Sequence, residues 1–224
     1  MPRTAAPQSA APWLYAAAVL GALGALVVAA AAASRPPLTA VDRSVADRLH
    51  AYALAHPAWT ETNRALTDWV WGPWTMRLLL LAALLALWVH RHRLLALWCA
   101  ATSAAGTALQ QGLKSLVGRA RPHWRHPVDT AHYAAMPSGH AMTAAVTCVL
   151  LVWLVHRYGL GGRRARTVTR CAVAAGAVSV PGVCLTRVAL GVHWLSDTVA
   201  GALLGGAVAA ASVGVWNSLT ARAR

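Results

Sequence analysis

Two basic residues in the middle of the chain have a spacing suited to binding an anion. Lys114 and Arg121 are seven residues apart, and Pro122 follows directly. On a helix end, that separation puts both cations on one side of the chain, about two turns apart. The pair predicts a site for one anion. The alternative is that both side chains extend to a membrane interface, as basic residues near helix ends do.

The motif Pro137-Ser138-Gly139-His140 stands immediately before an apolar run. A helix N-terminus exposes unpaired N–H groups and the positive end of the helix dipole, and both favour a bound anion. Ser138 adds a hydroxyl group, Gly139 lets a ligand approach the backbone, and His140 can donate a proton from the first turn. An ordinary helix cap followed by an interfacial histidine is the alternative interpretation.

Arg187, His193 and Asp197 form a third polar cluster. His193 and Asp197 are four residues apart, so on a helix they share a face. A carboxylate that binds one ring nitrogen fixes the tautomer and makes the other nitrogen more basic, an arrangement used in nucleophilic catalysis. Asp197 is also the one acidic residue in the last third of the chain, at the head of an apolar helix. An unpaired carboxylate is unfavourable there, which indicates a functional role.

The composition indicates which elements position these clusters. Of the 224 residues, 58% are hydrophobic and 12% are charged, and the mean hydropathy is +0.49. Soluble domains carry about twice that share of charge. A spanning helix needs about 20 mostly apolar residues. Six runs are therefore expected to cross a membrane: Trp13–Ala33, Trp74–His90, Leu94–Leu113, Ser138–Val155, Cys171–Thr186 and Leu195–Leu219.

The expected fold is all-α, a six-transmembrane-helix bundle that forms a single membrane domain over residues 1–224, with the motif-bearing core at about 94–219. Residues 38–72 hold four of the six acidic residues, and apolar residues recur there at helical spacing. This pattern predicts an amphipathic segment along the interface between the first two spans. The first run ends in three alanines, so a cleaved signal peptide is an alternative, although its apolar core is longer than a signal needs. The fifth run is expected to be interrupted at Pro181-Gly182.

The arginines indicate the topology. If the N-terminus is cytoplasmic, ten of the twenty basic residues lie inside, with no acidic residue among them: Arg3, Arg91, Arg93, Arg157, Arg163, Arg164, Arg166, Arg170, Arg222 and Arg224. This is the positive-inside pattern, and it is expected here with both termini cytoplasmic. The loops at 114–136 and 187–194, and with them the three clusters, then face outside. Because the basic residues are divided among short loops, they do not indicate nucleic-acid binding.

Cysteine and carboxylate usage indicates no metal centre. The four cysteines all lie in apolar runs without the spacing of a zinc site or a disulfide framework, and we expect buried thiols. Only Asp129 and Asp197 are carboxylates near the clusters, too few for a two-metal site. We therefore expect neither a metal nor another cofactor. The remaining eight histidines lie in loops or near the ends of apolar runs and are expected in interfacial or solvated positions.

Together the three clusters resemble the signature of the type 2 phosphatidic acid phosphatase superfamily, in the family's order and spacing. One departure is Thr186, where the family usually has serine before the arginine. The resemblance implies a phosphate-binding set made of Lys114, Arg121, Ser138, Gly139 and Arg187. It also implies that His193 attacks phosphorus to form a phosphohistidine and that Asp197 orients His193. His140 would protonate the leaving oxygen and then activate water.

The six-span layout resembles the membrane-bound bacterial members of the family. That resemblance implies hydrolysis of a phosphomonoester or diphosphate on a lipid, of the undecaprenyl diphosphate or phosphatidylglycerophosphate type. Two other classes stay open: a non-catalytic anion-binding membrane protein or transporter, and an enzyme like the vanadate-dependent haloperoxidases, which are soluble. The oligomeric state is not indicated, because Gly201 and Gly205 fit internal helix packing at least as well as a dimer seam.

Overall fold

The computed structural model describes residues 9–158 and 163–222, and over these ranges the chain is helical, without a strand. The elements follow in the order α1 Ala11–Ala32, α2 Pro36–Ala55, α3 Pro57–Ala65, the π-helix η1 Leu66–Val70, α4 Pro73–Val89, α5 Arg93–Val117, α6 Gly139–Tyr158, α7 Arg163–Ala189 and α8 Leu195–Arg222. The expected all-α fold is confirmed. Arg3 and Arg224, part of the predicted basic end, lie outside the described residues.

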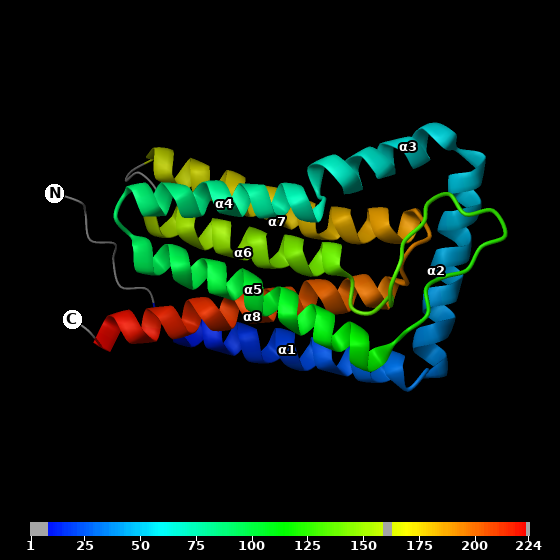
Figure 1. The fold of residues 1–224 in the computed structure, drawn as a ribbon, viewed down its shortest axis with the longest axis horizontal. Coiled ribbons are helices and arrows are strands. Elements are labelled where there is room, and N and C mark those ends of the chain that lie inside the picture. Colours follow the sequence, from blue (N-terminus) through cyan, green and yellow to red (C-terminus); the bar gives the residue numbers. More distant parts are fainter. Residues whose placement is uncertain (1–8, 159–162, 223–224) are drawn as a thin grey trace.

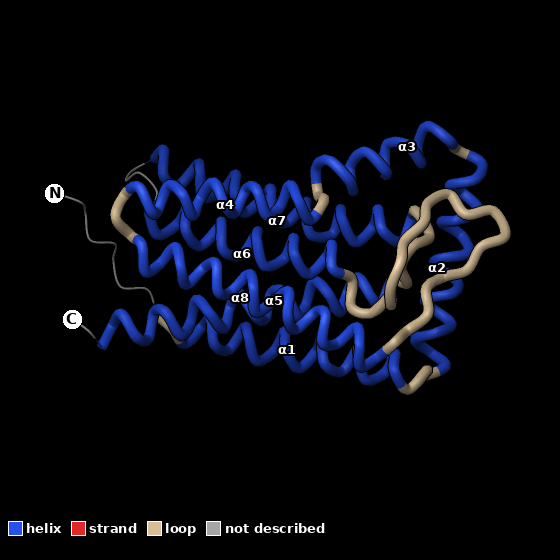
Figure 2. Tube along the Cα trace, viewed as in Figure 1, coloured by secondary structure: helices blue, strands red, loops and turns tan. Residues whose placement is uncertain are grey.

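Most of the helices run along the long axis of the molecule as one bundle: α1, α4, α5, α6, α7 and α8 (Figure 1). Helix α2 crosses one end of this bundle, and α3 leads back from it toward α4. The loop between α5 and α6 runs over the same end, beside α2 (Figure 2). The start of α1 and the end of α8 both lie at the opposite end.

Five stretches of the described chain are long and apolar enough to cross a membrane: Ala11–Ala32, Pro57–Val89, Gly139–Tyr158, Arg163–Ala189 and Leu195–Arg222. The remaining predicted span, Leu94–Leu113, lies within α5, which is 25 residues long and packs against α4, α6 and α8. Helix α5 is not among the five because polar residues interrupt its apolar sequence, including Thr102 and Gln110 on its buried face. Hydropathy alone would not assign α5 to the bundle, and its contacts with α4, α6 and α8 do.

Helices α6 and α8 form the centre of the bundle, since about half of each apolar stretch is buried by the rest of the protein. Two glycines of α8 permit their close contact. A Cβ atom on Gly201 would come within 2.5 Å of the Ser138 backbone oxygen, and one on Gly205 within 2.5 Å of the Met142 backbone oxygen. Within this chain, the small-residue pair therefore packs α8 against α6, and it is not free to form a dimer seam.

Helix α7 corrects the prediction of a short, interrupted fifth span. It runs without a break from Arg163 to Ala189, with Pro181 inside it. It is longer than predicted because it begins within the basic segment. The neighbouring Gly182 has a packing role. A Cβ atom at Gly182 would lie 2.4 Å from the indole ring of Trp71, so the absent side chain makes room for that ring.

The predicted amphipathic segment forms α2, α3 and η1. Its apolar residues Val41 and Tyr52 are 51% and 46% exposed, on the side of α2 that faces away from the protein. On the other side of the helix, Asp42 and His50 are both buried against the bundle. Their burial is possible because each has a partner in the segments that carry the site, as described below.

Candidate active site

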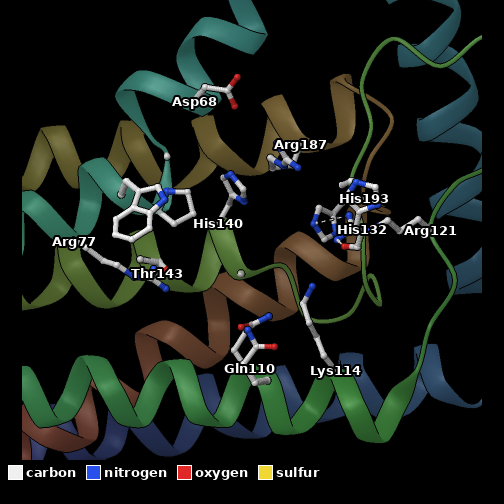
Figure 3. Close-up of a pocket in the computed structure, with 16 residues that line it drawn as sticks. Asp68, Arg77, Gln110, Lys114, Arg121, His132, His140, Thr143, Arg187 and His193 are labelled. Atoms are coloured by element: carbon white, nitrogen blue, oxygen red, sulfur yellow. Dashed lines mark hydrogen bonds between the residues drawn. The ribbon is translucent and has the colours of Figure 1, made fainter.

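The three polar clusters meet at the end of the bundle covered by α2 and the α5–α6 loop. They surround a cavity of about 570 Å³ whose lining includes Lys114, Arg121, Gly139, His140, Arg187 and His193 (Figure 3). These side chains come from α5, the following loop, the start of α6, the end of α7 and the α7–α8 turn. The other two predicted site residues, Ser138 and Asp197, are fully buried and do not line the cavity.

His193 is held from both sides of its ring. Its Nδ1 lies 3.4 Å from Oδ2 of Asp197, and the same oxygen accepts the Trp194 backbone N–H at 2.9 Å. On the other side, Nε2 lies 3.2 Å from Nη1 of Arg121. Because arginine can only donate, Nε2 is the unprotonated nitrogen, and Nδ1 carries the proton toward Asp197. The arrangement gives His193 the tautomer of a nucleophile whose free lone pair is on Nε2.

The surroundings of His193 keep its ring neutral. Burial is the main cause of a pKa well below the ordinary histidine value, and the nearby cations Arg121, Arg187 and Lys114 lower the pKa further. A neutral imidazole is the nucleophilic form. The same cations line the cavity together with His193, so they are available to bind the oxygens of a phosphoryl group.

Backbone carbonyls of the α5–α6 loop hold two of these cations in place. Arg121 donates from Nε to the Tyr133 carbonyl at 2.9 Å, and also to the carbonyl of Val192. Lys114 donates from Nζ to the Ala134 carbonyl at 2.7 Å. Burial lowers the pKa of Arg121, an effect partly offset by Asp197. A guanidinium pKa is high enough that the group stays charged.

Arg187 is buried and less fully paired. Its Nη1 lies 3.9 Å from Oδ2 of Asp129, and its Nε has no hydrogen-bond partner within the part of the chain that the structure describes. The Ser138 hydroxyl is also buried without a hydrogen-bond partner among the described residues. The Ser138 backbone N–H donates to the Asp197 carbonyl at 2.9 Å. Buried polar atoms without partners are unfavourable, and an anion in the cavity is a chemically suitable partner for Arg187, which lines it.

The N-terminus of α6 opens into the cavity at Gly139 and His140. A Cβ atom at Gly139 would lie 3.3 Å from Nε2 of Gln110, which also lines the cavity. Glycine therefore lets the Gln110 amide and the helix N-terminus share the space. The positive end of the helix dipole adds to the three cations.

A buried ion-pair network behind His193 was not anticipated from the sequence. Arg119 donates to Oδ1 of Asp197 at 2.6 Å and to Oδ2 of Asp42 at 2.7 Å. Asp42 also accepts the Ser196 backbone N–H at 2.8 Å and the Ser196 hydroxyl at 2.6 Å. Arg119 thus joins helix α2 to the carboxylate that contacts His193. Asp42 and Asp197 are 155 residues apart, so no local pattern links them.

His50 of α2 is buried, although it was expected in an interfacial or solvated position. His50 stacks on Trp124 with ring centroids 3.9 Å apart, and burial lowers its pKa. Trp124 donates from its indole nitrogen to the Gly191 carbonyl at 2.8 Å. Gly191 has φ +69° and no room for a Cβ atom beside Trp124. The turn that carries His193 is therefore supported from α2.

No group of three or more His, Cys, Asp or Glu side chains that could hold a metal ion occurs over residues 9–158 and 163–222. The thiols of Cys99, Cys148 and Cys184 are buried or half-buried, and Cys171 is exposed, contrary to the expectation that all four are buried. Helix α7 lies at the edge of the bundle with most of its apolar stretch unburied, which accounts for Cys171.

Comparison with known proteins identifies the class to which this fold and site belong. The sequence model of the PAP2 superfamily matches residues 95–220, which is more than half of the chain. The chain belongs to the PAP2 superfamily. No curated protein sequence matches it.

A solved structure gives the particular architecture. The crystal structure of a transmembrane PAP2 type phosphatidylglycerolphosphate phosphatase from Bacillus subtilis superimposes with a TM-score of 0.79 at 19% sequence identity. The alignment covers 92% of this chain and 98% of that one. At this identity the likeness shows the fold, and it makes this chain a multi-pass membrane protein with the architecture of a PAP2-type phosphatase.

Proposed function

We propose that the protein hydrolyses a phosphomonoester or diphosphate group on a lipid, through a phosphohistidine at His193. The observation that carries the proposal is the ring geometry. Asp197 faces Nδ1, while Nε2 is unprotonated and lies beside Arg121 at the wall of a cavity rich in cations. Phosphoryl transfer needs mainly positioning and stabilisation of charge on the equatorial oxygens, and this cavity is suited to both.

In the proposed first step, Nε2 of His193 attacks phosphorus and the bond from phosphorus to the leaving oxygen breaks. Lys114, Arg121 and Arg187, with Ser138 and the Gly139 backbone, would bind the phosphoryl oxygens. Asp197 would stabilise the positive charge that forms on the ring. His140, which faces the same cavity, would give its proton to the leaving oxygen. The negative charge of the bound phosphate offsets the nearby cations and favours protonated His140.

In the second step, water attacks the phosphohistidine while His140 takes a proton from it. The N–P bond breaks, inorganic phosphate leaves, and His193 returns to its neutral form. Three fixed cations and a helix N-terminus supply the positive charge that a metal supplies in other phosphoryl-transfer enzymes. We therefore propose that the reaction needs no metal, so activity should persist in excess EDTA and should be inhibited by vanadate, which resembles five-coordinate phosphorus.

We also propose that the protein lies in a bacterial cell membrane with the cavity facing outside and both termini cytoplasmic. The connection between α4 and α5, where Arg91 and Arg93 stand in the sequence, lies at the end of the bundle opposite α2 (Figure 1). Basic residues favour the cytoplasmic side. A cavity at one end of the bundle suits a lipid whose headgroup reacts while its tail stays in the bilayer.

The test is phosphate release by purified protein with lipid phosphates and with an aryl phosphate that has a good leaving group. His193→Ala should be inactive on every substrate. His140→Ala should lose on the order of 10²–10⁴ in rate on lipid phosphates. It should recover much of that loss on the aryl phosphate, whose leaving group departs without a proton. His123→Ala, an exposed histidine of the α5–α6 loop, is the control.

Rapid quench with labelled substrate should show an acid-labile, base-stable phosphoenzyme in the wild type and none in His193→Ala. If His193→Ala turns over the aryl phosphate while His140→Ala does not, the two roles are reversed. Binding of lipid phosphates without phosphate release would instead support the anion-binding or transport alternative.

A further inference from the structure

Helix α2 contributes a buried carboxylate to the site, although it lies outside residues 95–220, which the family model matches. Figure 1 shows α2 across the end of the bundle that carries the site. Asp42 of α2 is 2% exposed and contacts the residue next to Asp197. It accepts the Ser196 backbone N–H at 2.8 Å and the Ser196 hydroxyl at 2.6 Å. The reaction proposed above does not use this carboxylate.

Arg119 connects Asp42 to Asp197 through the two ends of its guanidinium. Nη2 donates to Oδ2 of Asp42 at 2.7 Å, and Nη1 donates to Oδ1 of Asp197 at 2.6 Å. Nη1 also donates to the Ser196 hydroxyl oxygen at 2.7 Å. A guanidinium is planar and its donors have fixed directions, so a contact that fixes one end also orients the other. Asp42 therefore orients the donor that contacts Asp197.

The two carboxylate oxygens of Asp197 have separate partners. Oδ1 accepts from Arg119, while Oδ2 accepts the Trp194 N–H at 2.9 Å and lies 3.4 Å from Nδ1 of His193. Because both oxygens are held, the carboxylate is fixed in the orientation that faces the ring. Arg119 also lies 5.7 Å from the ring centroid of Trp194, which directly follows His193. The orientation of Asp197 toward His193 thus depends on contacts that begin in α2.

The formal charge of this network depends on Asp42. Arg119 and Asp197 alone would be neutral as a pair, and Asp42 gives the three groups one net negative charge. All three side chains are at most 12% exposed, and charges interact more strongly in such surroundings than in water. The network lies behind a ring that becomes positive in the proposed reaction. Its net negative charge stabilises the positive ring better than a neutral pair would.

We propose that Asp42 is a positioning residue for phosphoryl transfer, which acts on His193 through Arg119 and Asp197. The inference rests on the function proposed above. As the bond from Nε2 to phosphorus forms, the bond to the leaving oxygen breaks and its electron pair leaves with that oxygen. The ring keeps its Nδ1 proton and becomes positive, and the Asp42 network stabilises this charge. Asp42 is not among the described residues that line the catalytic cavity, so it acts on this step and not on phosphate binding.

The first measurement is phosphate release from a lipid phosphate by Asp42→Asn, which keeps the size of the side chain and removes its charge. The kcat should fall about 10–100-fold, the range found when the outer hydrogen-bond partner of a metal-binding histidine is removed. The inhibition constant of inorganic phosphate should stay unchanged. Arg43→Gln, at the neighbouring exposed position of α2, is the matched control and should change neither quantity.

Two longer side chains separate the effect of charge from that of packing. Asp42→Glu and Asp42→Gln introduce side chains of the same size, so a purely structural role predicts equal kcat values. The positioning role predicts that Asp42→Glu is faster, because it keeps the charge. All variants are compared below the lowest of their unfolding midpoints.

Vanadate tests the inference without turnover, because it resembles five-coordinate phosphorus. Interactions that act in the transition state strengthen the binding of its analogues more than the binding of ground-state ligands. Calorimetry in detergent should show vanadate binding weakened about 10–100-fold in Asp42→Asn, with inorganic phosphate binding as in the wild type.

Equal weakening of vanadate and phosphate binding would show that Asp42 has only a structural role. An active wild type, with Asp42→Asn equal to Arg43→Gln in kcat and in vanadate binding, would overturn the inference and leave the proposed function standing. A wild type that releases no phosphate would contradict the proposed function, and the vanadate comparison would still decide the role of Asp42.

Discussion

The ion-pair network behind His193 leads to a prediction about stability. Replacing Arg119 by glutamine removes the cation between Asp42 and Asp197, whose side chains are 2% and 0% exposed. Removing one partner of a buried pair costs about 3–5 kcal/mol, because a charge stays buried without compensation. Here two carboxylates lose the same partner. We expect Arg119→Gln to lower the free energy of unfolding by at least this amount.

A chain of this length loses about 2–4 °C in Tm for each kcal/mol, so the midpoint should fall by about 6–20 °C. Cys99 provides the reporter because its thiol is fully buried. In a background where the other three cysteines are alanine, a thiol-reactive dye should label Cys99 only as the protein unfolds in detergent. Arg119→Lys should recover part of the loss, since one nitrogen cannot reach both carboxylates as the guanidinium does.

Asp42→Asn tests whether the effect comes from charge. Combined with Arg119→Gln, it removes one of the two uncompensated carboxylates, so the double variant should be more stable than the sum of the single losses predicts, by about 0.5–3 kcal/mol. Arg43→Gln, at the neighbouring exposed position of α2, is the control and should stay within about 0.5 kcal/mol of the wild type. A Tm for Arg119→Gln equal to that of Arg43→Gln would refute the reasoning, as would strict additivity.

Three further predictions concern packing, pH and orientation. Gly205→Ala should destabilise by about 1–3 kcal/mol or more because its Cβ atom meets the Met142 carbonyl, whereas Gly112→Ala, with nothing within 4 Å, should be neutral or stabilising in the same unfolding assay. Burial and the nearby cations lower the pKa of His193, so its ring stays neutral as the pH falls from neutral to 6.5. We therefore expect kcat/KM to stay constant over that range and to decline only in more acidic solution. A decline that begins above pH 6.5 would contradict this. Cysteine at exposed Thr130, in a background without the native cysteines, should react with an impermeant thiol reagent in intact cells, and labelling only after lysis would reverse the proposed orientation.

Much of the architecture could be predicted from the sequence, because the bilayer acts as a solvent that selects long apolar runs. Where those runs are uniform, as in α1, α6 and α8, their positions were predicted closely. The prediction failed where a local signal competes with tertiary packing. Pro181-Gly182 indicated a break, but in the bundle α7 continues through the proline and Gly182 accommodates Trp71.

For the site, residue type and spacing were sufficient to select the cavity-lining residues His140, His193, Lys114, Arg121 and Arg187. Each stands in a motif whose chemistry is readable over a few positions, and a carboxylate four residues from a histidine is a local relation. The roles of these residues in phosphate binding and catalysis remain predictions. The burial of Ser138 beneath the cavity wall was not foreseen, because it depends on how α6 meets α8.

Only the tertiary structure decided which distant residues complete the site. Arg119 bonds Asp197 directly, and it also bonds Asp42 because α2 brings Asp42 across the end of the bundle. Arg77 joins the cavity because α4 packs beside α6. Hydropathy and short-range spacing determine which segments form helices and where chemistry is possible, since those forces act along the chain. Long-range ion pairs and the charge of a cavity depend on how the helices pack together, and no local pattern records that arrangement.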